Sequence, residues 1–176
     1  EFGRLNYLVH SIAYAKKEEL ESLFLNTSRE GFHIAMDISA YSLITLSRAA
    51  AELMTKEGGS IVAMTYIASQ RAMPNYNVMG TAKAALEHCI RQLAYELGEK
   101  NIRVNGISAG PLRTLSARAI SSFNEMLLNH QKKAPLGRNI EHNEVAKTAL
   151  YLLSDLSSGV TGEIIYVDAG YHIVGI

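Results

Sequence analysis

The sequence predicts an α/β fold in which a parallel β-sheet carries helices on both faces. Two observations support this prediction: four apolar runs resemble buried strands, and stretches with helical spacing of apolar residues separate them. The expected strands are residues 5–13, 60–66, 101–108 and 163–168. Because strand and helix alternate along all 176 residues, a length that suits one domain, we expect a single domain built on one sheet.

The first strand is a mostly apolar run, as expected for a central parallel strand that is covered on both faces. Ligands of open α/β sheets bind beyond the carboxyl ends of such strands. Residues 10–15 follow the apolar run and therefore form a candidate wall of a binding site. The polar residues 16–30 predict a short helix and a connection.

Helical spacing then runs through residues 38–55 and stops at Gly58 and Gly59, which predicts a long crossover helix. After the second strand, a loop leads into another helix. We expect this helix to begin near Pro74, because proline suits a first helical turn, and to end near Gly98 as its C-cap.

The third strand contains one polar residue, Asn105, which we expect to be hydrogen-bonded to the backbone rather than catalytic. Residues 115–133 mix apolar and polar side chains. They suit either a helical lid over an apolar substrate or an ordinary amphipathic surface helix, and the pattern alone leaves both open. Residues 141–154 predict a further amphipathic helix before the fourth strand.

Composition limits the classes of function. Seventeen basic and seventeen acidic residues cancel without forming long blocks, which argues against nucleic acid and anionic membranes as partners. No apolar run approaches the ~20 residues of a membrane helix, and no signal-peptide pattern is seen. A single cysteine, Cys89, allows no internal disulfide, and the six histidines lack the spacing of metal ligands. We expect a cytoplasmic protein without a metal.

The strongest candidate for chemistry is the pair Tyr76 and Lys83. Seven helical positions turn the chain by about 700°, so both side chains share one face, about 10.5 Å apart along the axis. A nearby ammonium favours the phenolate and makes the hydroxyl a better donor to a developing oxyanion. The pair by itself also fits an ordinary amphipathic helix with a buried face and a solvated rim.

Two further features join this pair: Tyr66, ten residues before Tyr76, and the segment 108–111, Ser-Ala-Gly-Pro, after the third strand. On these marks, the chain from residue 5 to residue 170 resembles the enoyl-acyl-carrier-protein reductases, a divergent branch of the short-chain dehydrogenase/reductase superfamily. Common members of that superfamily carry a tyrosine four residues before the lysine and a serine about seventeen before it. Here Met79 and Tyr66 occupy those positions.

The resemblance implies a Rossmann-type doubly wound parallel sheet, of which this chain holds the C-terminal part with about four strands and flanking helices. It implies reduction of the trans-2 double bond of enoyl thioesters on acyl carrier protein, by hydride transfer from NADH, with NADPH not excluded, in bacterial fatty-acid elongation. Family members are usually homotetramers. We therefore expect a homo-oligomer.

The resemblance also assigns roles to residues. The expected catalytic residues are Tyr66, Tyr76 and Lys83. Tyr76 is expected to donate a hydrogen bond to the enolate, and Lys83 to hold the nicotinamide ribose hydroxyls. The expected cofactor-binding residues are Ile12, Lys83, Leu112, Arg113, Thr114, Leu115 and Ser116. The expected substrate-binding residues are Ala15, Tyr66 and Tyr76.

A dinucleotide site of this type begins with a strand, a glycine-rich turn and a helix that receives the pyrophosphate. The 176 residues contain no such turn, and they open without Met directly before an apolar strand. We therefore expect the chain to be the C-terminal portion of a longer protein whose first strands are absent here. The strand at residues 5–13 would then be an open edge of the sheet, and cofactor binding would be impaired.

Two alternatives stay open. The first is a ketoacyl reductase or another short-chain dehydrogenase, against which Met79 argues because it cannot donate a proton to a carbonyl. The second is a cofactor-free truncated scaffold or interaction module, which the missing glycine-rich turn favours. The sequence fixes neither the choice between NADH and NADPH nor the acyl chain length.

Overall fold

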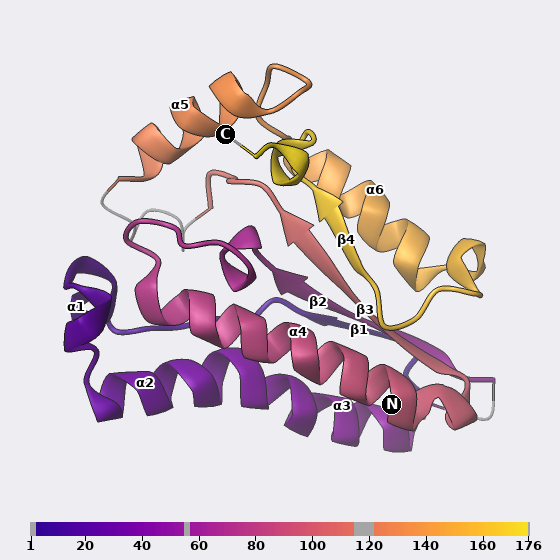
Figure 1. The fold of residues 1–176 in the computed structure, drawn as a ribbon. Coiled ribbons are helices and arrows are strands. Elements are labelled where there is room, and N and C mark those ends of the chain that lie inside the picture. The colour runs from indigo at the N-terminus through magenta and orange to yellow at the C-terminus, as the bar shows by residue number, and fades with distance from the viewer. Residues whose placement is uncertain (1–2, 55–56, 115–121, 176) are drawn as a thin grey trace.

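The structure is a computed structural model that describes residues 3–54, 57–114 and 122–175. Its centre is a four-stranded parallel sheet in the order β1-β2-β3-β4 (Figure 1). The strands are β1 Tyr7–His10, β2 Gly59–Thr65, β3 Ile102–Ala109 and β4 Ile164–Val167. The expected α/β fold with four parallel strands is confirmed.

Helices cover both faces of the sheet (Figure 1). They are α1 Lys17–Glu21, α2 Arg29–Met36, α3 Ser42–Leu53, α4 Asn77–Leu97, α5 Phe123–Lys133 and α6 His142–Leu153. Alternation along β2 explains the two layers: Ile61 and Ala63 pack with α3 and α4, whereas Val62 packs with Leu152 of α6. All four side chains are fully buried, so the apolar run forms a strand that is covered on both faces.

The predicted element ends mostly agree with the structure, with small shifts. Gly98 is the C-cap of α4, but its φ of −58° lets a 3₁₀ turn continue to Lys100, and Asn101 takes the left-handed position with φ 57°. The segment predicted as helical from residue 115 is described from residue 122 onward, where α5 begins at Phe123. Residues 115–121 lie outside the described part of the chain.

The crossover helix begins earlier than the sequence predicts. Helical structure starts at Arg29, where the Ser28 hydroxyl accepts a hydrogen bond from the Gly31 N–H, and reaches Leu53 through a π-helical turn at Asp37–Tyr41. The prediction missed this start because residues 16–30 are largely polar. The wide turn presents Ser39 to the segment after β1: its hydroxyl accepts from the Tyr14 N–H at 2.9 Å and donates to the Tyr14 carbonyl at 3.1 Å.

In the sheet described here the first strand lies at the open edge that was expected for this chain, not at the central position that its apolar run alone predicts. β1 pairs only with β2 and lies at the edge, so Tyr7 and Val9 are 54% and 51% exposed. β2 and β3 are buried as their apolar runs predict, whereas β4, at the other edge of the sheet, is only partly buried. Asn105 in β3 behaves as predicted, donating to the Val160 carbonyl and accepting from the Glu163 N–H.

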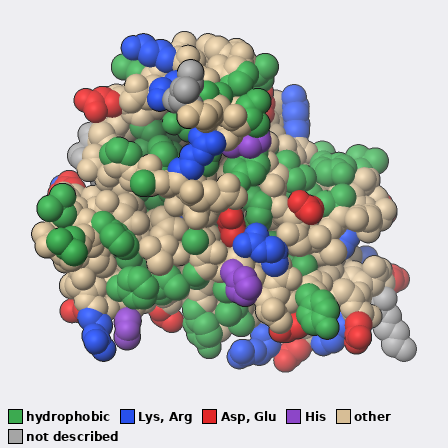
Figure 2. Space-filling model, in the orientation of Figure 1, with side chains coloured by type: hydrophobic (Ala, Val, Ile, Leu, Met, Phe, Trp, Pro, Cys, Tyr) green, Lys and Arg blue, Asp and Glu red, His purple; other side chains and the backbone are tan. Residues whose placement is uncertain are grey.

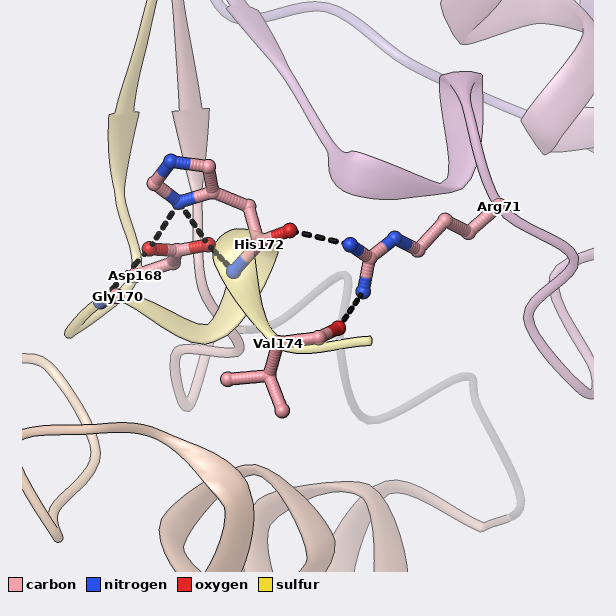
Figure 3. Close-up of polar contacts among 5 residues, drawn as sticks. All are labelled: Arg71, Asp168, Gly170, His172 and Val174. Atoms are coloured by element: carbon pink, nitrogen blue, oxygen red, sulfur yellow. Dashed lines mark hydrogen bonds and ion pairs between the residues drawn. The ribbon is translucent and has the colours of Figure 1, made fainter. Parts of the chain in front are cut away.

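The last described residues fold back against the loop that follows β2 (Figure 3). The Arg71 guanidinium donates to the carbonyls of His172 and Val174. Asp168 accepts from the backbone N–H groups of Gly170 and His172, and its carboxylate lies 3.0 Å from the His172 ring nitrogen Nδ1. These contacts tie the C-terminal segment to the loop that connects β2 with α4.

Charged side chains of both signs are scattered over the face shown in Figure 2, with apolar side chains between them. This agrees with the cancelling charges of the sequence. Within the three described ranges, no helix is long and apolar enough to cross a membrane.

Candidate active site

A cavity of about 410 Å³ opens at the carboxyl ends of the strands. It is the place where the ligands of parallel sheets are expected, because the loops that follow neighbouring strands converge there. Its wall is formed by the residues after β1, α1, the end of β2, the start of α4, the loop after β3 and α5. Its lining includes Tyr14, Ala15, Tyr66, Tyr76, Lys83 and Thr114.

Two tyrosines meet in this wall. Tyr66 directly follows β2, and Tyr76 is the N-cap residue of α4. Their ring centroids are 4.9 Å apart with the planes tilted by 58°, and the Tyr66 hydroxyl donates to the sulfur of Met126 on α5. Asn75 and Asn77 on either side of Tyr76 have positive φ angles of 60° and 36°, a conformation that asparagine tolerates better than most residues. This turn sets Tyr76 at the cavity.

Burial keeps both phenols protonated. Desolvation raises the pKa of Tyr76, and desolvation together with the neighbouring Tyr76 and Tyr171 raises the pKa of Tyr66. The expectation that Lys83 would favour the Tyr76 phenolate is therefore wrong. The physical reason is that burial disfavours the charged phenolate, while Lys83 is not among the groups that shift the pKa of Tyr76. Tyr76 is a neutral hydrogen-bond donor at neutral pH.

Lys83 lines the same cavity as Tyr76, so the predicted shared helical face is confirmed. Its side chain is only 5% exposed, and its Nζ donates to the Met64 carbonyl at 2.8 Å. Burial lowers the pKa of Lys83 to about 8, and the nearby Glu87 carboxylate opposes this shift. Lys83 is thus a largely protonated, buried cation near pH 7.

The other predicted site residues divide into three groups. Ala15, Leu112 and Thr114 line the cavity. Ile12 and Arg113 are not brought to it: Ile12 is 43% exposed, and Arg113 bonds to Asn124 beside a larger hollow of about 730 Å³ between α5 and the start of α6. That larger hollow contains none of the predicted catalytic side chains, so it is not the candidate site. Leu115 and Ser116 lie outside the described residues.

Sequence reasoning missed part of the apolar wall, namely Leu20, Met64 and Met79, which line the cavity with the tyrosines. Phe123 and Met126 of α5 also line it, and they belong to the segment for which a lid over the substrate was one of two alternatives. Their only signal was hydrophobicity at helical or strand spacing, which equally predicts ordinary core positions. The lining makes this an apolar cavity with a few polar groups, the usual character of a small-molecule site.

The donors around the cavity fit a nucleotide cofactor better than a metal. An ammonium has three N–H donors, and the hydrogen bond described for Lys83 uses one of them. In the described ranges, no group of three or more His, Cys, Asp or Glu side chains could hold a metal ion. The remaining donors of Lys83 suit the hydroxyl groups of a ribose, and the loop at Pro111 and Leu112 offers main-chain groups nearby.

The chain is similar to one well-characterised group of proteins. The sequence profile of the family described as "Enoyl-(Acyl carrier protein) reductase" matches residues 1–172. Enoyl-[acyl-carrier-protein] reductase [NADPH] FabI of Staphylococcus aureus (strain MRSA252) is 55% identical over 174 residues, which are 99% of this chain and 68% of the relative. Enoyl-[acyl-carrier-protein] reductase [NADH] FabI of Nostoc sp. is 53% identical over 175 residues, or 99% and 67%.

Solved structures agree. The Bacillus cereus enoyl-acyl carrier protein reductase with NADP⁺ and indole naphthyridinone superposes with a TM-score of 0.97 at 49% identity, covering 100% of this chain and 68% of that one. The enoyl-[acyl-carrier-protein] reductase (NADH) of Aquifex aeolicus gives a TM-score of 0.96 at 48% identity, covering 99% and 68%. The chain therefore spans about two thirds of the length of these relatives.

Proposed function

This chain belongs to the enoyl-acyl-carrier-protein reductase family, and on that premise we propose that it reduces the trans-2 double bond of enoyl thioesters in bacterial fatty-acid elongation. The substrate is carried on acyl carrier protein. The observation that carries the proposal is the meeting of Tyr76, Tyr66 and Lys83 in the wall of one apolar cavity. Residues 1–176 act as one Rossmann-type domain that supplies the nicotinamide and substrate side of the site.

NADH or NADPH, when bound, supplies the hydride that the β-carbon of the substrate receives. Lys83 binds the ribose hydroxyls through the N–H groups that Met64 does not use. Leu112 and Thr114 line the same cavity and are proposed as cofactor contacts. For Ile12 and Arg113, which lie outside the cavity, and for Leu115 and Ser116, which lie outside the described residues, a cofactor contact rests on the family resemblance alone. The names of the relatives include NADPH for one and NADH for another. Measuring the KM of this protein for NADH and for NADPH would show which cofactor it prefers.

Tyr76 stabilises the negative charge that develops on the thioester oxygen as the hydride arrives. A preorganised donor in a site that excludes water lowers the barrier for such a step. The raised pKa of Tyr76 supports this role, since a phenol that stays protonated can donate throughout. Ala15 and Tyr66 line the cavity beside it and contact the thioester end of the substrate.

Met79 distinguishes this reaction from carbonyl reduction. It is 5% exposed and lines the cavity at the position where ordinary short-chain dehydrogenases carry their tyrosine. A thioether has no proton to donate to a ketone oxygen. The site therefore favours an enoyl over a ketoacyl substrate.

The decisive experiment compares an enoyl thioester and a ketoacyl thioester, each with NADH and with NADPH. It uses this chain and a version extended at its N-terminus by the glycine-rich turn and flanking strands of a family member. We expect oxidation of the cofactor with the enoyl thioester only, and tighter cofactor binding by the extended version. Reduction of the ketoacyl thioester alone would replace the proposed function.

Self-association into a homotetramer and a cytoplasmic location complete the proposal. An apolar hollow of about 610 Å³ formed by residues of α2, the π-helical turn, α3 and α4 supports self-association. It is lined by Ile34, Met36, Ala40, Tyr41, Ile44, Ala85 and Cys89, with His33 and Asp37. Analytical ultracentrifugation tests whether the chain forms a tetramer. Cell fractionation tests whether the protein is in the cytoplasm, where it would meet acyl carrier protein.

A further inference from the structure

A buried carboxylate lies beneath the cavity and has no part in the reaction as proposed. Glu87 on α4 is only 3% exposed, one helical turn after Lys83. Burying a carboxylate is costly unless hydrogen bonds and an opposite charge compensate for the lost water. The residues around Glu87 must therefore compensate for the cost of burying its carboxylate.

Lys83 and Glu87 bond to two successive residues at the end of β2. The Lys83 ammonium donates to the Met64 carbonyl at 2.8 Å, and the Thr65 hydroxyl donates to Glu87 Oε1 at 2.8 Å. A spacing of four residues places both side chains on one face of α4, toward the strand. Together the two hydrogen bonds join α4 to the two residues directly before Tyr66.

We propose that Glu87 is a positioning residue that, with Thr65, keeps Lys83 charged and directed at the cavity. This inference rests on the proposed function, in which the ammonium binds the ribose hydroxyls of the cofactor. Glu87 itself does not line the cavity described above, so it acts through Lys83 rather than on the substrate.

The electrostatics support this role. Burial lowers the pKa of Lys83 to about 8, and Glu87 is the group that opposes the shift. Without the carboxylate, burial would act alone and the pKa of Lys83 would fall further. Less of Lys83 would then be protonated near pH 7 to 8, and the loss would be smaller at lower pH, where the ammonium persists.

Other titratable groups surround the pair. Burial and the Lys83 ammonium lower the pKa of His10 on β1, so His10 is neutral at pH 7 and repels Lys83 little. Burial and then Glu87 raise the pKa of Tyr166 on β4. Tyr66 and Tyr76 in the cavity wall are kept protonated by burial. Glu87 is thus the group among them that supplies negative charge to Lys83 at neutral pH.

The test is Glu87→Gln, which removes the charge but keeps an oxygen that can accept from Thr65. Lysines labelled with ¹³C at Cε report the titration of Lys83 by NMR, with the signal assigned through Lys83→Arg. We expect Lys83 to titrate at lower pH in Glu87→Gln than in the wild type. The matched control is Glu96→Gln, an exposed carboxylate on the same helix, which should leave the titration unchanged.

Kinetics provide a second readout. For the extended version of the chain, a fall of about one pKa unit lowers the protonated fraction of Lys83 at pH 8 from about one half to about one tenth. The cofactor KM of Glu87→Gln should therefore exceed that of the wild type by about fivefold at pH 8, and by much less at pH 6.5. A purely structural defect would instead raise KM by the same factor at both pH values. Titration of Lys83 at the same pH in both proteins would overturn the inference.

If Glu87→Gln fails to fold, adding Lys83→Met decides the matter. Restored folding of the double variant supports the pairing, because the uncompensated ammonium has been removed. A double variant that stays unfolded overturns it and assigns Glu87 to packing alone. Neither the NMR titration nor the folding rescue requires catalysis, so absence of enoyl reduction would refute the proposed function without deciding the role of Glu87.

Discussion

Burial keeps the phenol of Tyr76 protonated, and this sets what the residue can do. A neutral phenol in an apolar wall is a fixed hydrogen-bond donor, not a base. The pKa of Lys83 shifts in the other direction, because burial lowers it to about 8 and the ammonium loses its proton more easily. The two side chains of one helical face thus respond oppositely to the same environment, since burial disfavours the charged form of each.

Replacing Tyr76 by Phe should lower kcat for enoyl reduction on the order of 10²-fold, because one donor to the developing oxyanion is lost. The cofactor KM should change little, since the phenol ring and its packing remain. Steady-state kinetics on the extended chain measure both values. Tyr95→Phe is the control, because Tyr95 lies on the same helix and is 83% exposed. Unaltered turnover in Tyr76→Phe would remove the residue from its role.

The lowered pKa of Lys83 predicts a dependence of stability on pH. Between about 8 and the ordinary value of 10.5, the unfolded chain holds the proton that the folded chain has released. Stability therefore rises with pH in this window, whereas below about pH 8 the cost of burying the Lys83 ammonium is constant. The measurement is urea unfolding of the wild type and of Lys83→Met from pH 7 to pH 10. Above pH 8, the unfolding free energy of the wild type should rise relative to that of the variant. A constant difference would contradict the lowered pKa.

At the scale of elements, the π-helical turn before α3 contacts the segment after β1, which forms part of the cavity wall. Ser39 in this turn is fully buried and makes two hydrogen bonds to the backbone of Tyr14. Ser42, just after it, lies 2.8 Å from the ring of His10. A π turn often marks a functional site because its extra residue redirects side chains. Here it holds the segment that follows β1.

Ser39→Ala should destabilise the fold by about 0.5–1.5 kcal/mol, because it removes the part-buried hydrogen bonds to the backbone of Tyr14. Hydrogen exchange at the Tyr14 amide should quicken in this variant, and denaturant unfolding gives the free energy. Ser22→Ala, which changes an exposed serine, serves as the control. Equal exchange rates at Tyr14 in wild type and Ser39→Ala would show that another contact holds this segment.

At the scale of the whole molecule, the sheet is asymmetric. β2 and β3 are covered on both sides by α3, α4 and α6, while β1 leaves one edge uncovered with Tyr7 and Val9 exposed. Unpaired strand edges with apolar side chains favour association of one chain with another. The opposite end of the chain is tied down by Arg71 and Asp168 (Figure 3).

The exposed edge predicts that this 176-residue chain aggregates through β1. Val9→Lys places a charge on the uncovered edge and should reduce aggregation, as lysines do at natural edges. Light scattering over a concentration series measures the effect. Leu150→Lys, at an exposed apolar residue on α6, is the control for charge alone. Equal relief by both variants would locate the association elsewhere.

The sequence predicted the fold well because its main signals are local. Apolar runs located all four strands within a few residues, and helical spacing located the helices from α3 onward. It missed the start of α2 and the π turn, since a capping serine and one wide turn leave almost no trace in hydrophobicity. It also identified Tyr76 and Lys83 as neighbours on one face, because helix geometry fixes that relation.

The sequence by itself determined the order of strands and helices, the family resemblance, and which phenol and ammonium share a helix face, because residue spacing and residue type suffice for these. Only the tertiary structure decided that Tyr76 stays protonated, that Lys83 bonds to Met64, and that Glu87 is buried beside them. Burial and charge pairing depend on residues that are remote in the chain, so no local pattern contains them.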